Sequence, residues 1–490
     1  MRSLRWILLA LLPVLFGSTA FAGGQGHGHG FGSHLRPAPP PPAQLRRDGR
    51  WLVDPAGRIV LVHGVNAVWK HAPWAPPATA AGFTARDADF LAANGFNAVR
   101  LGVLFAGVMP RPGVVDQGYL DRIDRIVQLL AARHIWVLLD FHQDDYSTKF
   151  TGEGFPDWAV DDNGLPFTPT GSFFTNYFTP AVSRTFDNLW SNASGLWGAY
   201  ATGWAQVAER WARQPYLMGY DLFNEPSAGS QSASCFNPAG CPVFDAQLQS
   251  FYDHVRAAIR SQDRGNLVWY EPQMFFNAMS KSNFTREDDP QVGLSWHNYA
   301  CTPAFAGSGV LPGEPDCVAN EPRVFANADQ QIADLGSTGV MTEFGSTNDL
   351  PDLARLTGLA DGALTGWMYW AYKAWQDPTG QPATEGLFTR DDDLGTLIAG
   401  KADVLIRPYP QAIAGTPTSL SWDPATSVMR LIYTAGGQKA PTDVFVPQRH
   451  YPHGYRAVVT GGHVVSAPGA THLLVTAKPG TTVTVTVRPR

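Results

Sequence analysis

The stretch LMGYDLFNE (217–225) is an apolar run that ends in two polar residues, Asn224 and Glu225. An apolar run of this length predicts a strand that is buried on both faces. Seven similar runs occur between residues 59 and 372, and stretches with helical spacing separate most of them. Strands that alternate with helices predict parallel pairing, and eight such units predict a closed (β/α)8 TIM barrel, here over residues 45–410.

The eight predicted barrel strands occupy the following runs: IVLVHGVNAV (59–68), FNAVRLGVL (96–104), IWVLLDFH (135–142), LMGYDLFNE (217–225), NLVWYEP (266–272), VGLSWHNY (292–299), GVMTEFG (339–345) and GWMYWAY (366–372). Between the second and third runs, YLDRIDRIVQLLAARH (119–134) predicts an amphipathic helix with Leu120, Ile123, Ile126, Val127 and Leu130 on one face. An open doubly wound sheet is the alternative fold. This alternative is disfavoured because no glycine-rich phosphate-binding loop follows the first run, and because a TIM barrel contains eight strand–helix units, the number found here.

The first 22 residues have the three-part layout of a secretory signal peptide. Arg2 and Arg5 flank the start of the apolar run WILLALLPVLF, and AFA (20–22) offers a small-residue cleavage site. No later stretch reaches about 18 uninterrupted apolar residues, so we expect a secreted, extracellular protein. Residues 23–44, rich in glycine, histidine and proline, are expected to form an extended linker. Weak metal binding by its histidines is the alternative, but glycine does not hold a ligand in place.

The four cysteines agree with an oxidising compartment. Cys235 and Cys241 lie six positions apart and Cys301 and Cys317 sixteen, so these local pairs are the simplest of the three connectivities. We interpret these two pairs as disulfide bonds that hold loops in place.

After Pro408 and Pro410 the residue pattern changes from long apolar runs and helical spacing to alternating apolar and polar residues. Alternating runs such as SVMRLIYT (427–434) and TTVTVTVR (481–488) predict a small β-sandwich over residues 411–490. We expect this domain to buttress the barrel, and carbohydrate binding is its alternative role.

The overall charge excludes one class of partner. The chain carries 36 basic and 42 acidic residues, a formal charge of −6, and therefore has no basic field to hold phosphates. We expect no nucleic-acid partner. The 16 tryptophans fit sugar binding better.

Polar residues stand at the ends of the predicted strands. They are Arg100, His142, Asn224, Glu225, His297, Tyr299, Glu343 and Trp370. The carboxyl ends of the strands of such a barrel gather at one rim and carry its chemistry, so we expect these side chains to share one pocket.

Two glutamates in one pocket suit glycoside hydrolysis, which needs an acid for the leaving oxygen and a second carboxylate to attack or to activate water. We expect strands four and seven, which end near Glu225 and Glu343, to face each other across the barrel. The acid must keep its proton near neutral pH, which a dry pocket and a second carboxylate favour. Three further acids have other interpretations. Asp140 and Asp221 are expected to be structural anchors, whereas Glu271 either binds sugar or holds a loop.

Four motifs together resemble glycoside hydrolase family 5 of clan A: RLG (100–102), FNEP (223–226), HNY (297–299) and TEFG (342–345). The resemblance implies a retaining double displacement without a metal or organic cofactor, with Glu225 as acid/base and Glu343 as nucleophile. It also implies a role for the other residues: Asn224 binds the sugar 2-hydroxyl, Tyr299 hydrogen-bonds near the nucleophile, Arg100 supports Glu343, and His142, His297 and Trp370 surround the first sugar.

Within that family the chain resembles the endoglycoceramidases, from about residue 45 to the C-terminus. The resemblance rests on stretches such as DFHQDDYSTKFTGEGFPDWAV (140–160), NLVWYEPQMFFN (266–277) and LIRPYPQAIAGTP (405–417). It implies cleavage of the β-linkage between glucose and ceramide, and it adds Lys70 and Asp144 to the sugar-binding set. Asp145 and Phe141 depart from the pattern, where an apolar residue and a methionine are usual, and leave the aglycone open.

We therefore expect a secreted retaining β-glycosidase that releases oligosaccharide and ceramide from glycosphingolipids. The alternatives are a retaining β-glucosidase or endo-β-glucanase for a steryl glucoside, another β-glucoside or an oligosaccharide, and a carbohydrate-binding protein without catalysis. A glycolipid substrate implies an apolar slot beside Glu225, built from PQMFFNAM (272–279) and FFTNYFTP (173–180). It also implies transient contact with a membrane or micelle surface.

Overall fold

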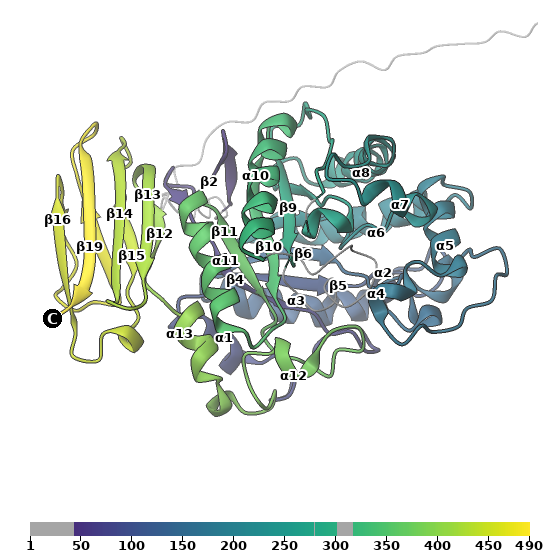
Figure 1. Cartoon of the computed structure of the whole chain (residues 1–490), viewed down its shortest axis with the longest axis horizontal. Coiled ribbons are helices and arrows are strands. Elements are labelled where there is room, and N and C mark those ends of the chain that lie inside the picture. The colour runs from purple at the N-terminus through teal and green to yellow at the C-terminus, as the bar shows by residue number, and fades with distance from the viewer. Residues whose placement is uncertain (1–43, 279, 301–316) are drawn as a thin grey trace, which may run out of the picture. The chain divides into compact units, whose positions relative to one another are not determined.

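The computed structural model describes residues 44–278, 280–300 and 317–490 (Figure 1). The expected signal peptide, nearly all of the expected linker, and Cys301 with its expected partner bond lie outside the described residues. The other expected disulfide, Cys235–Cys241, is formed, with the two Cα atoms 4.7 Å apart. None of the helices in the described part of the chain is long and apolar enough to span a membrane.

Eight parallel strands close into a barrel, which confirms the predicted fold. In order around the barrel they are β4 (His63–Ala67), β5 (Ala98–Val103), β6 (Trp136–Phe141), β7 (Leu217–Asp221), β8 (Val268–Tyr270), β9 (Val292–Asn298), β10 (Thr338–Gly345) and β11 (Gly366–Trp370). Each coincides with one of the predicted runs. Their residues are almost all buried, because side chains fill the barrel on one face and helices cover the other.

The helices are α1 (Ala85–Ala93), α2 (Phe105–Val108), α3 (Gln117–Ala131), α4 (Phe173–Asn176), α5 (Pro180–Trp190), α6 (Leu196–Trp211), α7 (Ser232–Cys235), α8 (Pro242–Gln262), α10 (Cys317–Leu335), α11 (Leu350–Ala363), α12 (Pro382–Glu385) and α13 (Ala399–Leu405). Helix α3 lies in the stretch predicted to be amphipathic, and its five expected apolar positions are buried. Helix α4 is a single short turn in the long loop that follows β6, and it becomes important at the site.

The first predicted run serves two sheets rather than one. Only β4 belongs to the barrel, whereas β3 (Ile59–Val60) pairs antiparallel with β12 (Tyr409–Ile413), Val60 opposite Ala412. An unbroken apolar run indicates burial but does not tell which sheet receives each residue, so the sequence could not show this division.

The C-terminal region forms two antiparallel sheets, as the predicted β-sandwich requires. One sheet has the order β1 (Arg46–Asp48), β2 (Trp51–Val53), β3, β12, β15 (Thr442–Phe445), β18 (His472–Thr476), β17 (His463–Val464). The other has the order β13 (Gly415–Asp423), β14 (Val428–Ala435), β19 (Thr482–Pro489), β16 (Tyr455–Thr460). Side chains from both sheets, among them Leu431, Val475 and Val485, form one apolar core. Strands β1 to β3, which precede the barrel in the chain, complete the first sheet and so tie the N-terminal segment to this domain.

Candidate active site

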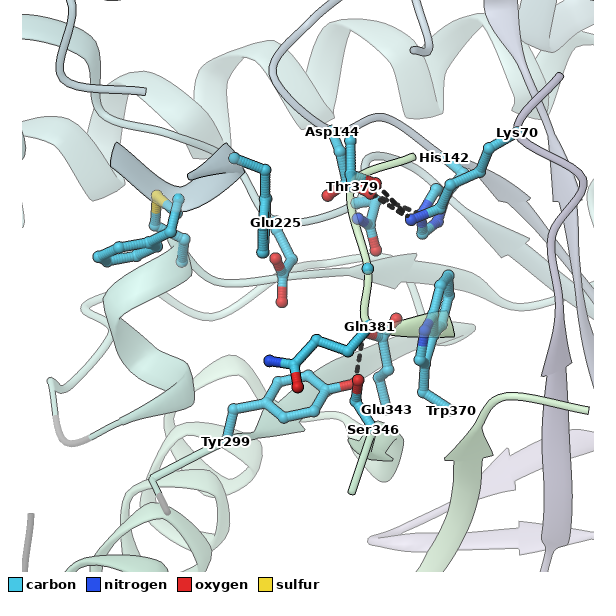
Figure 2. A pocket seen from close by; sticks show the side chains of 15 residues that line it. Lys70, His142, Asp144, Glu225, Tyr299, Glu343, Ser346, Trp370, Thr379 and Gln381 are labelled. Atoms are coloured by element: carbon cyan, nitrogen blue, oxygen red, sulfur yellow. Dashed lines mark hydrogen bonds and ion pairs between the residues drawn. The ribbon is translucent and has the colours of Figure 1, made fainter. Parts of the chain in front are cut away.

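A pocket that is open to solvent lies at the carboxyl ends of the barrel strands (Figure 2). Its lining consists of Lys70, His142, Asp144, Phe173, Phe174, Asn224, Glu225, Met274, Tyr299, Glu343, Ser346, Trp370, Thr379, Gly380 and Gln381. Eight of the ten residues that the sequence singled out are in this set. The other two, Arg100 and His297, lie directly behind it with fully buried side chains.

Glu225 reaches the pocket just after β7. Its backbone has φ +43°, in the left-handed region that a residue other than glycine adopts at a cost. The conformation is held by the backbone N–H of Glu225, which donates to Oε1 of Glu271 at 2.9 Å. The side-chain Oε1 of Glu225 lies 2.6 Å from Nδ2 of Asn277 and 2.8 Å from Nδ1 of His297. Among the described residues, Glu225 thus has an amide and an imidazole as hydrogen-bond partners and no ion pair with a lysine or an arginine.

Glu343 lies near the end of β10 and has a different environment. Its Oε1 accepts a hydrogen bond from the hydroxyl of Tyr299 at 2.8 Å, and its Oε2 accepts one from Nη1 of Arg100 at 3.1 Å. The guanidinium of Arg100 favours the ionised form of this carboxyl group. The hydroxyl of Tyr299 stays protonated as a donor, because burial and the charge of Glu343 raise its pKa well above the usual value.

The two glutamates lie close to one another. A carboxylate oxygen of Glu225, a ring nitrogen of His297 and a carboxylate oxygen of Glu343 all lie within 4.8 Å of one another. Burial, followed by the charge of Asp144, raises the pKa of Glu225 to about 7. Burial also raises the pKa of Glu343, and the charge of Arg100 opposes that rise. The pair thus combines one carboxyl group that is about half protonated at neutral pH with one that is paired to a cation.

Arg100 is the centre of a buried ionic network that supports both glutamates. Its Nε donates to Asp221 at 2.8 Å, and its Nη2 lies 3.0 Å from Asp140 and 3.3 Å from Glu271. The same Nη2 donates to Oδ1 of Asn224 at 3.0 Å. Asp140, Asp221 and Glu271 are fully buried, so they anchor Arg100 and the backbone of Glu225 and do not line the pocket.

One side of the pocket carries buried charges. Nζ of Lys70 lies 2.6 Å from Asp144 and 2.8 Å from Asp377, and 4.5 Å from the centre of the Trp370 ring. His142 stacks on Trp370 with its ring centre 5.2 Å away. Burial lowers the pKa of His142, but the charge and hydrogen bond of Asp140 together with the hydrogen bond of Asp144 outweigh it and raise the pKa to about 9. Figure 2 shows Lys70, His142, Asp144 and Thr379 gathered on this side.

The other part of the lining is apolar and comes from two loops. Phe173 and Phe174 belong to α4, and Met274 begins the 3-10 turn Met274–Asn277 that follows β8. The two loops are those that the sequence assigned to an apolar slot. Nδ2 of Asn176, the last residue of α4, donates to Oδ2 of Asp145 at 3.0 Å. Asp145 follows Asp144 directly, so this bond joins the apolar wall to the charged side.

Sequence reasoning missed several residues of the site. Asn277 contacts Glu225, and Thr379 and Gln381 line the pocket from the loop after β11. The hydroxyl of Thr379 accepts a hydrogen bond from Lys70 at 2.8 Å across a separation of 309 residues. None of these residues stands at the end of a predicted strand, so the strand-end pattern carried no signal for them.

Two groups of described residues have the spacing of metal ligands. They are His142, Asp144 and Glu153, and Glu225, His297 and Glu343. In the first group the ammonium of Lys70 already lies 2.6 Å from Asp144 and 3.7 Å from Glu153, so a cation of the protein itself stands beside these carboxylates. In the second, Glu343 is paired with Arg100. A reaction that uses only the side chains present therefore remains our prediction.

Comparisons with known proteins agree with this geometry. Residues 53–376 match the family Cellulase (glycosyl hydrolase family 5), and residues 407–487 match the glycoside hydrolase family 5 C-terminal domain. The chain is 36% identical to endoglycoceramidase I of Rhodococcus hoagii (strain 103S), over 90% of this chain and 88% of the relative. It is 29% identical to the endoglycoceramidase of Hydra vulgaris, over 83% of this chain and 81% of the relative.

A solved structure gives the same result. Endo-glycoceramidase II from Rhodococcus sp., in its ganglioside GM3 complex, superposes with a TM-score of 0.75 at 30% identity. The match covers 90% of this chain and 100% of that chain. Both the barrel and the C-terminal sheets are therefore shared.

Proposed function

This chain belongs to glycoside hydrolase family 5, and we propose that it hydrolyses the β-glucosyl linkage of glycosphingolipids with retention, releasing oligosaccharide and ceramide. It is a glycoside hydrolase of endoglycoceramidase type by the comparisons above. The observation that carries the finer proposal is the pair Glu225 and Glu343, with oxygens within 4.8 Å, set between a charged and an apolar wall. A separation of about 5–5.5 Å favours direct attack by a carboxylate over attack by water, hence retention.

The environments of the two glutamates support their assignment. Glu343, paired with Arg100, is the nucleophile, and Glu225, whose pKa is about 7, is the acid. In the first step a carboxylate oxygen of Glu343 bonds to the anomeric carbon while the bond from that carbon to the glycosidic oxygen breaks. The proton of Glu225 passes to that oxygen, and ceramide leaves as an alcohol.

The second step restores the enzyme. Glu225, now ionised, accepts a proton from water as the water oxygen bonds to the anomeric carbon. The ester bond to Glu343 breaks, which frees the oligosaccharide and regenerates both side chains. Two inversions give net retention.

The walls of the pocket support the choice of substrate. Lys70, Asp144 and Asn224 offer charged and polar groups to a sugar, and Trp370 offers an aromatic face. Phe173, Phe174 and Met274 offer apolar surface to an aglycone. The family comparison supports the same class, since a relative of known structure was solved in complex with ganglioside GM3.

The experiment is a product analysis with three substrates: lactosylceramide, an aryl β-lactoside and a soluble β-glucan. The wild type is expected to release intact lactose and ceramide, and NMR of the early product is expected to detect the β-anomer. Glu343→Ala and Glu225→Gln are each expected to abolish this release, whereas Glu209→Gln, on the exposed surface of α6, is expected to keep it. Hydrolysis of β-glucan without hydrolysis of lactosylceramide, or an α-anomeric first product, would contradict the proposal.

We also propose that the protein is exported and meets its substrate at a lipid surface. The signal-like first 22 residues and the disulfide Cys235–Cys241 support export, and the apolar wall supports contact with lipid. Recovery of the protein from the culture medium with an N-terminus near Gly23 is the expected result. A protein retained in the cytoplasm with Met1 intact would contradict export.

A further inference from the structure

Asn277 contacts Glu225 and also Tyr299, the hydrogen-bond partner of Glu343, although the sequence indicated no role for it. It ends the 3-10 turn Met274–Asn277, and only 2% of its surface is exposed. Its side-chain Nδ2 donates to Oε1 of Glu225 at 2.6 Å, which is short for a hydrogen bond from an amide. Its backbone carbonyl accepts a hydrogen bond from the N–H of Tyr299 at 2.9 Å.

The hydrogen bonds of Glu225 are unequally shared between its two oxygens. Oε1 is contacted by Asn277 at 2.6 Å and by His297 at 2.8 Å. Burial lowers the pKa of His297 to about 3, so the ring is neutral and carries one N–H. We assign that hydrogen to Nδ1, because Nδ1 faces carboxylate oxygens of both Glu225 and Glu271, the latter at 3.5 Å. Oε1 thus accepts two hydrogen bonds, whereas Oε2 has no protein hydrogen bond among the described residues.

From this geometry we infer that Asn277 is a positioning residue for proton transfer: with His297 it occupies Oε1 of Glu225 and leaves Oε2 to carry and deliver the proton. An oxygen that accepts two N–H groups is a poor place for a proton, because the proton would face two donors. The inference rests on the proposed function, since it assigns the atom through which Glu225 acts in that reaction.

The same amide also affects the charge state of Glu225. A hydrogen bond from a neutral donor favours the carboxylate form and so opposes a rise in pKa. Burial and the carboxylate of Asp144 raise the pKa of Glu225, while the charges of His142, Arg100 and Lys70 oppose the rise. Four further groups face Glu225: Glu271, Glu343, His297 and Tyr299. All four are still present when Asn277 is replaced. Loss of the Asn277 amide is therefore expected to raise the pKa of Glu225 further.

Asn277 also couples the acid to the nucleophile. Its carbonyl holds the backbone of Tyr299, and the hydroxyl of Tyr299 donates to Glu343. One short turn after β8 thus contacts Glu225 through a side chain and the partner of Glu343 through the backbone. The backbone contact survives a side-chain substitution, so the variants below change the contact with Glu225 alone.

The test compares Asn277→Ala and Asn277→Asp with wild type and with Asn298→Ala. Asn298 is a matched control, because it is a fully buried asparagine on β9 whose Nδ2 donates to the carbonyl of Glu321, and no hydrogen bond among the described residues joins its side chain to either glutamate. Each protein is assayed over a range of pH with lactosylceramide and with a dinitrophenyl β-lactoside, whose leaving group needs no proton. Thermal unfolding of all four proteins checks that each is folded.

For Asn277→Ala we expect kcat/KM for lactosylceramide to fall about tenfold or more, because proton donation is worth about 10²–10⁴ in rate. We expect less than about a threefold change for the dinitrophenyl substrate. The alkaline limb of the pH profile of kcat/KM, set by loss of the Glu225 proton, is expected to move to higher pH. The shift is expected to be larger for Asn277→Asp, which places a second carboxyl group beside Glu225.

Three outcomes would overturn the inference: an unchanged pH profile in both Asn277 variants, an equal loss on both substrates, or the same change in Asn298→Ala. An inactive wild type is a different result, because it refutes the proposed function and is read from the wild-type assay alone. A variant that fails to unfold cooperatively is replaced by Asn277→Ser, which keeps a small polar side chain but shortens the donor, and the same shift of the alkaline limb is expected for it.

Discussion

The charged and apolar sides of the pocket are built in different ways. Lys70 and Asp144 lie shortly after the barrel strands β4 and β6, and buried ion pairs join Lys70 to Asp144 and to Asp377. Phe173 and Phe174 lie on a helix of four residues within a long loop, and one buried bond between Asn176 and Asp145 ties that helix to the barrel. The difference indicates that the charged side is costly to alter, whereas the apolar side can change with little effect on the fold. Loops on a fixed barrel are where specificity varies most easily.

The largest effect is expected from Lys70→Met, which breaks the charged side. It removes the ammonium group that pairs with the buried carboxylates of Asp144 and Asp377, and loss of one member of a buried ion pair costs about 3–5 kcal/mol. We expect a fall of that size in the free energy of unfolding, measured with denaturant, together with loss of activity on every substrate. Lys149→Met is the control, because the side chain of Lys149 is 45% exposed and its pair with Asp162 is worth at most about 1 kcal/mol. Equal losses in the two variants would show that the charged side is no more costly to alter than an exposed ion pair.

A smaller and more selective effect is expected from Phe173→Ala on the apolar side. Phe173 lines the pocket and is only half-buried, so its loss is expected to cost the lipid about 1.5 kcal/mol of apolar contact, or about a tenfold rise in KM for lactosylceramide. The aryl lactoside, which lacks lipid chains, is expected to change by less than about twofold. Phe167→Ala, a half-buried aromatic residue outside the pocket, serves as control. An equal rise for both substrates would remove the distinction between the two sides.

The link between the two sides is tested by Asp145→Asn. Burial raises the pKa of Asp145 to about 9, whereas an unfolded aspartate titrates near about 3.9. Between about pH 4 and about pH 9 the folded state holds a proton that the unfolded state has released, so this residue lowers the free energy of unfolding as pH rises. Asparagine has no such proton and can still accept the hydrogen bond from Asn176. We expect the variant to gain stability relative to wild type as pH rises through that window, measured by urea unfolding.

Asp121→Asn, at an exposed position on α3, is the control for that measurement. The same pH slope in wild type and Asp145→Asn would mean that Asp145 is ionised in the folded protein, and that it does not join the two sides as a neutral acid.

The smallest effect is expected from Gln381→Ala. Figure 2 shows its side chain extending across the pocket toward Tyr299, away from the charged side. Loss of one neutral hydrogen bond to a sugar is worth about 0.5–1.5 kcal/mol, or about two- to tenfold in kcat/KM. Because Gln381 is expected to contact the sugar, lactosylceramide and the aryl lactoside are expected to be affected equally, in contrast to Phe173→Ala. Gln128→Ala, on the outer surface of α3, is the control.

Much of this architecture followed from local patterns. The eight apolar runs each delivered a barrel strand, and the polar residues at their ends, Glu225 and Glu343 among them, met in one pocket. The parts of the C-terminal sheet and of the pocket that the sequence did not predict come from segments without such a pattern. The strands β1 to β3 join the C-terminal sheet, and Thr379 reaches Lys70 over 309 positions, through contacts that leave no periodicity in the sequence.

The sequence by itself determined the alternation of strands and helices and the position of two glutamates at strand ends. A parallel strand that is buried on both faces is a continuous run of apolar residues, and such a run can be recognised locally. Only the tertiary structure decided how near the two carboxyl groups come and which oxygen of Glu225 is left for the proton. Those features depend on closure of the barrel and on single hydrogen bonds between distant residues, such as the bond from Asn277 to Glu225.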